Sequence, residues 1–222
     1  MVEREEWFKI AEKFRLEGTP TTAKVTGSGH IHETILVGTE SRRYILQKIN
    51  GRIFPDAEAL KNNFSRVTAH LRDKVQSRGG DSSRECLSLV PTREGKAFWR
   101  SGYSAWRMFP YVEDSVCHLL PDRPGLLREA GSAFGEFLRD LADFPASSLH
   151  EILPGFHDTH ARFLAFRKSV RDDRCGRAPE VRADIDFAMD RSELAGLFRE
   201  AFLLGRLPLR VTPNDAKLAN VL

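Results

Sequence analysis

Apolar and polar residues alternate through much of the first half of the chain, which predicts β-strands. Two short β-prone runs lie within Ala23–Val37 and meet at a glycine-containing turn. A third run covers Arg43–Asn50, and the later runs lie at 86–90, 97–100 and 104–109. Residues 91–95 are expected to turn the chain between two of these runs. From these six runs we expect an antiparallel sheet of five strands.

Apolar residues at intervals of three and four predict helices elsewhere. Asp56 is placed to cap a helix that is inserted between the third strand and the later ones, and the polar stretch 76–83 after it is expected to be a loop. From Pro121 onward the pattern is helical. The expected helices lie at 4–16, 57–71, 127–141 and 159–170, and a further helical stretch at 179–204 has a break between 189 and 194. We therefore predict an α+β fold with two lobes, a small lobe at 1–110 and an incomplete helical large lobe at 111–222.

The last twelve residues carry the most specific group of polar side chains. Asp215, Lys217 and Asn220 have the spacing D-x-K-x-x-N, which the catalytic loop of kinases uses. A carboxylate beside a hydroxyl, an ammonium beside a phosphate and an amide oxygen beside Mg²⁺ would then come from one loop. The residues around them are expected to form a strand end, a turn and a strand start. A solvated turn without chemistry is the alternative.

The glycine turn between the first two strands could approach phosphate oxygens, because glycine has no Cβ. Gly27, Ser28 and Gly29 form this turn, and a plain β-hairpin is the alternative. Lys48 shares strand parity with Tyr44 and Leu46, so an ammonium is predicted on their face of the sheet. This lysine would bind nucleotide phosphates, unless it is an ordinary surface residue.

Two further segments could contact the nucleotide. Glu58 is the glutamate available in the first turns of the inserted helix to pair with Lys48, although a surface acid favoured by the helix dipole is the simpler interpretation. The segment 110–114 would be the hinge between lobes, where backbone groups could bind adenine. Met108 and Tyr111 are the expected nucleotide contacts there.

Composition excludes several classes of protein. The 222 residues are 41% hydrophobic and 29% charged, as in ordinary globular proteins, and a net charge of +3 is too small to predict a nucleic-acid partner. The three cysteines are far apart, which favours reduced thiols in a cytoplasmic protein. An acidic N-terminus and the lack of a long apolar run predict neither a signal peptide nor a membrane span. The pairs His30/His32 and His157/His160 lack the distant partners that a metal site would need.

The predicted elements and motifs together resemble the aminoglycoside phosphotransferase-type small-molecule kinases, in particular the N-acetylhexosamine 1-kinases. The matching stretches, in the same order, are 27–31, 44–50, 153–159 and 207–222. The resemblance implies a protein kinase-like fold and transfer of the ATP γ-phosphoryl group to the anomeric hydroxyl of an amino sugar, with Mg²⁺. It implies that Asp215 is the base, that Asn220 holds Mg²⁺, that Lys48 holds the nucleotide phosphates and that His30 faces the sugar.

Two departures from this family bear on activity. Pro213 stands where the family usually has histidine, and it fixes φ and removes a backbone donor close to the predicted base. The sequence stops after Asn220, before the usual metal-binding aspartate, so a truncated chain with little activity is expected. The alternatives left open are a kinase for choline, homoserine or an aminoglycoside, and an inactive remnant that binds nucleotide or a partner protein. The oligomeric state is not predicted.

Overall fold

The computed structural model describes residues 2–27, 31–102 and 104–222, and the chain divides into two compact units. Unit 1 comprises Met1–Ile152 together with Arg210–Leu222, and unit 2 comprises Leu153–Leu209. The terminal loop with the predicted catalytic residues therefore belongs to unit 1. The lobe boundary near residue 110 stays a prediction.

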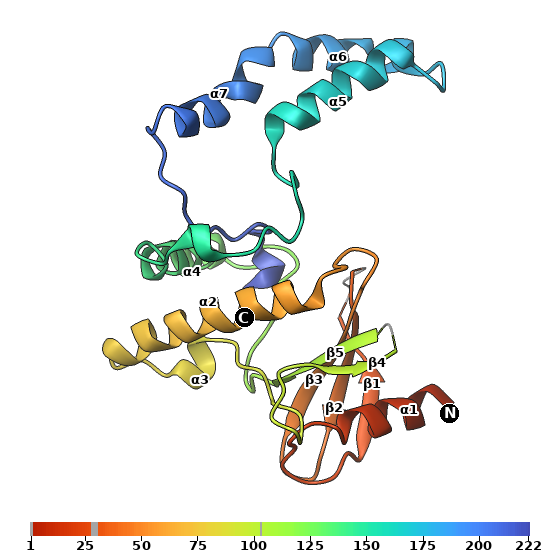
Figure 1. Cartoon of the computed structure of the whole chain (residues 1–222), viewed down its shortest axis with the longest axis vertical. Helices are drawn as coiled ribbons and strands as arrows, with labels where there is room; N and C mark the ends of the chain where they lie inside the picture. Colours follow the sequence, from red (N-terminus) through yellow and green to blue (C-terminus); the bar gives the residue numbers. More distant parts are fainter. Residues whose placement is uncertain (1, 28–30, 103) are drawn as a thin grey trace. The chain divides into compact units, whose positions relative to one another are not determined.

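Unit 1 is built on a five-stranded antiparallel sheet (Figure 1). The strands lie in the order β1-β2-β3-β5-β4, with bounds Thr22–Val25 (β1), Glu33–Gly38 (β2), Arg43–Ile49 (β3), Ser104–Pro110 (β5) and Trp99–Ser101 (β4). Ile35, Leu46 and Met108 are register partners across the three central strands, and all three are fully buried. The predicted α+β fold with five antiparallel strands is confirmed.

One face of this sheet packs against the N-terminal helix α1 (Val2–Ala11). Ile10 and Ala11 from the end of the helix join a core with Tyr44, Leu46 and other strand residues of the same parity. The helix ends earlier than predicted, because Phe14 forms a β-bridge with Thr92 instead of continuing the helix. Phe14 is still buried in the same core, as its apolar spacing indicated.

The other face of the sheet packs against α2 (Ala57–Ser77). Ala57 joins Ile49, Phe98 and Ala105 in a second core, and the ring of Phe64 meets Phe109 edge-on at a centroid distance of 5.7 Å. The helix continues six residues beyond the predicted Leu71, and a short helix α3 (Ser82–Glu85) follows where only a loop was expected. The two faces are thus covered by different helices, which fixes the surroundings of each strand residue.

Capping of α2 by Asp56 is confirmed by a hydrogen bond of 2.9 Å from the Ala59 N–H to Asp56 Oδ1. We expect Asp56→Ala to lower the free energy of unfolding of unit 1 by about 1 kcal/mol, because an orphan N–H would lose its partner. Urea denaturation measures this change. Asp73→Ala, on the exposed surface of the same helix, is the matched control and should change stability by less than about 0.5 kcal/mol. Equal effects of the two substitutions would contradict the capping role.

The predicted strand at 86–90 is wrong. β5 pairs on one side with β3 and on the other with β4, through Trp99↔Trp106 and Ser101↔Ser104. From the segment 86–90, the Val90 N–H alone donates a backbone bond to β5, at 2.8 Å to the Met108 carbonyl. The turn expected at 91–95 is present, with the Thr92 N–H bonded to the Lys96 carbonyl at 2.7 Å.

Two further segments of unit 1 lie beside α2. The helix α4 (Leu126–Asp140) buries Leu126, Ala130 and Asp140, whose carboxylate accepts hydrogen bonds from Arg78 and Arg139. A short 3-10 helix η1 (Ala146–Ser148) follows α4. The terminal segment contains a turn and a 3-10 helix, η3 (Leu218–Asn220), so the strands predicted around the catalytic loop are wrong.

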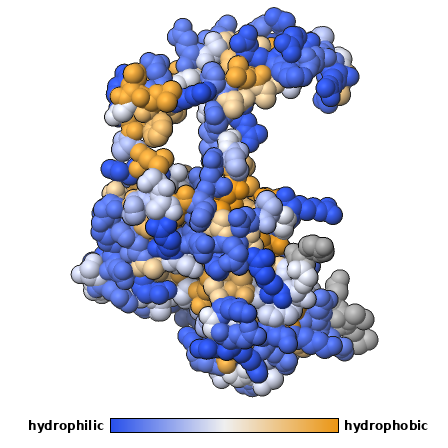
Figure 2. Space-filling model, viewed as in Figure 1, coloured by the Kyte–Doolittle hydropathy of each residue, from blue (hydrophilic) through white to orange (hydrophobic). Residues whose placement is uncertain are grey.

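Unit 2 is helical, with α5 (Thr159–Asp172), the 3-10 helix η2 (Ala178–Val181), α6 (Arg182–Met189) and α7 (Ser192–Leu203). These bounds follow the predicted helices closely. Among the described residues of this unit only Ile185 is buried, and apolar side chains gather on the surface of α7 (Figure 2). In the part of the chain that the structure describes, no helix is both long enough and apolar enough to cross a membrane.

Candidate active site

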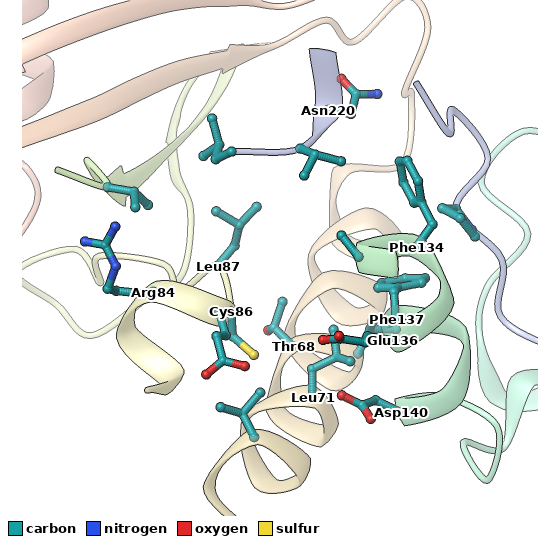
Figure 3. A pocket seen from close by; sticks show the side chains of 18 of the residues that line it. Thr68, Leu71, Arg84, Cys86, Leu87, Phe134, Glu136, Phe137, Asp140 and Asn220 are labelled. Carbon is teal, nitrogen blue, oxygen red and sulfur yellow. The ribbon is translucent and has the colours of Figure 1, made fainter. Parts of the chain in front are cut away.

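A pocket of about 730 Å³ lies in unit 1 between α2, the segment after α3, α4 and the terminal loop (Figure 3). Leu71 of α2 and Phe137 of α4 form part of an apolar wall, and Cys86 faces them. Burial raises the pKa of the Cys86 thiol, which favours its neutral form. The terminal loop contributes Asp215 and Asn220 to the lining, alongside charged residues of α3, of α4 and at the end of α2.

The terminal loop brings together the three residues predicted to form the catalytic set. Lys217 Nζ lies 2.7 Å from Asp215 Oδ2, and the Asn220 side-chain amide donates to the Asp215 carbonyl at 2.7 Å. Hydrogen bonds from Lys217 and then Asn220 hold the pKa of the Asp215 carboxyl below its ordinary value. Asp215 is therefore an exposed, ionised carboxylate at neutral pH, on the wall of a pocket.

Lys48 is not among the residues that line this pocket. Its side chain lies on the α1 face of the sheet, as its parity with Tyr44 and Leu46 predicted. There its Nζ is 3.9 Å from Glu33 Oε2 and 5.4 Å from the centre of the Trp106 ring. Glu33 also accepts a hydrogen bond from Trp7 of α1. Lys48 thus lies beside a carboxylate on the α1 face of the sheet, whereas α2 covers the other face. The structure does not bring Lys48 together with Asp215.

Glu58 also has partners other than the one predicted. Its carboxylate pairs with Lys61 one turn along α2 and lies 3.0 Å from Arg100 of β4. The hydrogen bond from Lys61 is the main reason that the pKa of Glu58 is lowered. The pair of Lys48 with Glu58 expected from the sequence is therefore absent from the described ion pairs, and the surface-acid interpretation describes the observed contacts.

The predicted nucleotide contacts lie in different surroundings. Met108 is fully buried in the α1-side core, and its carbonyl accepts the bond from Val90. The Tyr111 ring is covered by Arg43, with the guanidinium carbon 4.2 Å from the ring centre. Gly27 has a φ of +81°, which favours glycine, and a Cβ there would meet open space. Ser28, Gly29 and His30 lie outside the described residues.

A polar row on the α2 face of the sheet was not predicted. Gln47 pairs in register with Thr34 of β2 and Arg107 of β5. Arg107 donates to Gln47 Oε1 from Nε at 2.9 Å and from Nη2 at 2.6 Å, and Gln47 Nε2 donates to Thr34 Oγ1 at 3.1 Å. Strand parity could have predicted that Gln47 points to the opposite face of the sheet from its neighbours Leu46 and Lys48. The sequence did not show which face α2 would cover.

The surroundings of this row are apolar. Arg107 lies 5.1 Å from the centre of the Phe109 ring and 5.8 Å from that of Phe64. Burial lowers the pKa of Arg107 to about 10, so its guanidinium stays charged at neutral pH. The ring of His32 stacks on Phe54. Burial, and then the charge of Arg107, lower the pKa of His32, so its neutral imidazole is favoured. The α2 face therefore holds a positive charge that is partly buried, that of Arg107.

A magnesium ion is compatible with the terminal loop. Mg²⁺ usually takes only one or two protein oxygen ligands and completes its shell with water and substrate phosphates. Because the Asn220 NH₂ group donates to the backbone, its Oδ1 is left as an acceptor, and the Asp215 carboxylate is close by. Among the described residues, no group of three or more histidine, cysteine, aspartate and glutamate side chains could hold a metal by itself. A metal here would need ligands from the substrate.

Comparison with known proteins decides the family. A model of the phosphotransferase enzyme family matches residues 22–222, from the first strand to the terminal loop. The chain belongs to the phosphotransferase enzyme family. The resemblance found in the sequence is thereby confirmed at the level of the family, and the match includes both the sheet and the D-x-K-x-x-N loop.

Three solved structures of phosphotransferases are similar to this family member. A spectinomycin phosphotransferase in complex with ADP and spectinomycin is 13% identical, with a TM-score of 0.43 over 75% of this chain and 47% of that chain. An aminoglycoside phosphotransferase from Alicyclobacillus acidocaldarius is 14% identical, with a TM-score of 0.49 over 76% and 42%. The AMP-bound complex of spectinomycin phosphotransferase is 14% identical, with a TM-score of 0.46 over 75% and 47%. This chain spans less than half of the length of these solved chains.

Proposed function

We propose that this chain transfers the γ-phosphoryl group of ATP to a hydroxyl group of a small molecule, and that the acceptor is the anomeric hydroxyl of an N-acetylhexosamine. Membership in a phosphotransferase family supports the reaction type. The observation that carries the proposal is the ionised Asp215 carboxylate, which lies on a pocket wall beside Lys217 and Asn220. The resemblance of four ordered sequence stretches supports the sugar acceptor.

In this proposal the three residues of the loop have different roles. Asp215 accepts the proton of the acceptor hydroxyl as the oxygen attacks the γ-phosphorus, and the bond to the β–γ bridging oxygen breaks to release ADP. Lys217 keeps Asp215 ionised and supplies positive charge beside the phosphoryl group. Asn220 would hold Mg²⁺, and the ion would supply positive charge beside the phosphate oxygens.

Lys217→Met should change the pH dependence of the reaction. Removing the main hydrogen bond to Asp215 would let the pKa of this carboxyl rise toward its ordinary value. Because the base must be deprotonated, the acid limb of the profile of kcat/KM against pH should move to higher pH. Arg206→Met, which removes a cation paired with Glu200 in unit 2, is the control and should leave that limb in place. An acid limb that moves to lower pH would contradict the proposed role of Lys217.

The proposed function is tested by ADP release with a panel of acceptors. We expect MgATP turnover with N-acetylglucosamine or N-acetylgalactosamine, and little with choline, homoserine or an aminoglycoside. If only one of the other acceptors is turned over, the proposed reaction type stands and the proposed sugar acceptor is wrong. A form extended through the downstream reading frame should be assayed in parallel, because the chain spans less than half of the solved phosphotransferases.

A second candidate function is nucleotide binding without turnover. Pro213 in the catalytic loop and the pairing of Lys48 with Glu33 on the α1 face favour it. Calorimetric binding of ATP, combined with no ADP release from any acceptor by either form, would establish this second function.

A further inference from the structure

The Thr34, Gln47 and Arg107 row on the α2 face has the form of a binding site for an anion. The three residues are register partners on adjacent strands, so the sheet itself fixes their spacing. Gln47 is oriented by its two partners, with its oxygen toward the guanidinium and its NH₂ group toward the Thr34 hydroxyl. These hydrogen bonds orient the side chains of the row before any ligand binds.

The charge of this row is not balanced. Loss of solvent is the only cause that acts on the pKa of Arg107, and no described carboxylate forms an ion pair with it. The two phenylalanine rings and the amide oxygen of Gln47 stabilise the guanidinium only in part. A partly buried cation without a counter-ion is less well solvated than one in water, so an anionic ligand would be favoured at this position.

Some hydrogen-bond donors of the row have no acceptor among the described residues. A guanidinium has five N–H groups, and Arg107 donates to Gln47 Oε1 from Nε and from Nη2. Its Nη1 makes no hydrogen bond to another described residue, and the Thr34 hydroxyl, which accepts from Gln47, can still donate. These donors suit the oxygens of a phosphate group, which arginine binds in a forked arrangement.

Lys48 is less suited to the same task. Its ammonium already lies near Glu33, so its charge is partly neutralised, and it points to the face that α1 covers. We propose that Arg107, oriented by Gln47, binds the phosphate groups of the nucleotide on the α2 face of the sheet, in place of Lys48. This inference rests on the proposed function, since it assigns the phosphate anchor of the same reaction.

The test compares the loss of charge on the two faces. ATP affinity is measured by calorimetry for wild type, Arg107→Met and Lys48→Met, with Arg42→Met, which removes an exposed cation in the β2–β3 turn, as the matched control. We expect Arg107→Met to weaken ATP binding about 10- to 100-fold, the effect of losing a charge-assisted contact to phosphate. Lys48→Met and Arg42→Met should weaken binding less than about threefold. Arg107→Lys, which keeps the charge but loses the fork, should fall between these values.

The outcomes separate this inference from the proposed function. If wild type binds ATP and Arg107→Met binds it equally well, or if Lys48→Met causes the larger loss, the inference is wrong and ATP use stands. If wild type does not bind ATP, both fail together.

A second measurement does not depend on the folding of the Arg107→Met variant. The Nε–H resonance of Arg107 in wild type, assigned from its loss in Arg107→Lys, should shift on addition of ATP and not on addition of adenosine. An unchanged resonance at saturating ATP would overturn the inference.

Discussion

Asp215→Asn is expected to lower the rate of phosphoryl transfer by about 10² to 10⁴-fold, the usual contribution of a general base. The change removes the ionised carboxylate but keeps the size of the side chain, so ATP affinity should stay within about threefold of wild type. Steady-state ADP release gives the rate, and calorimetry gives the affinity. The substitution lies in an exposed loop and should leave the unfolding of unit 1 unchanged.

Asp186→Asn provides the matched control for this experiment. Asp186 is an exposed aspartate of unit 2 that pairs with Arg182, so it has an ion pair like that of Asp215 but lies far along the chain from the loop. Its substitution should leave turnover within about twofold of wild type. If the two variants turn over at the same rate, Asp215 is not the base.

Leu46→Ala should have the largest effect on stability. Leu46 is completely buried at the centre of β3, between Ile35 and Met108, and its removal would leave a cavity in the α1-side core. We expect a loss of about 2 to 5 kcal/mol in the free energy of unfolding. Urea denaturation followed by tryptophan fluorescence reports on this unit, because all three tryptophans, Trp7, Trp99 and Trp106, lie in it.

A leucine-to-alanine substitution at an exposed site is the control for Leu46→Ala. Leu127 is 64% exposed on α4, so Leu127→Ala should cost less than about 0.5 kcal/mol. A small effect at Leu46 would mean that the sheet core is not packed as the structure describes.

Local signals in the sequence predicted most of the fold. Asp56 followed by apolar residues at intervals of three and four predicted α2 and its cap, and alternation predicted β2, β3 and β5. These predictions succeed because capping and periodicity depend on neighbouring residues. The strand at 86–90 failed because a strand needs a ladder of backbone hydrogen bonds to a partner edge, and this segment donates a single one to β5, from Val90.

The candidate site was less predictable than the fold. The spacing of Asp215, Lys217 and Asn220 did identify residues that contact one another, since one short loop carries all three. Parity correctly grouped Lys48 with Leu46, but only packing decides that α1 covers that face and α2 the other. For the same reason the sequence did not indicate that Gln47 and Arg107 would meet beneath α2.

We propose above all that this chain transfers the γ-phosphoryl group of ATP to the hydroxyl group of a small molecule, with Asp215 as the base. ³¹P NMR of MgATP mixed with N-acetylgalactosamine and the protein tests it most directly. We expect a new phosphate-ester resonance that grows together with the ADP signals in wild type and is lost in Asp215→Asn. ATP that stays intact with every acceptor offered, or an ester that forms as fast in Asp215→Asn, would contradict it.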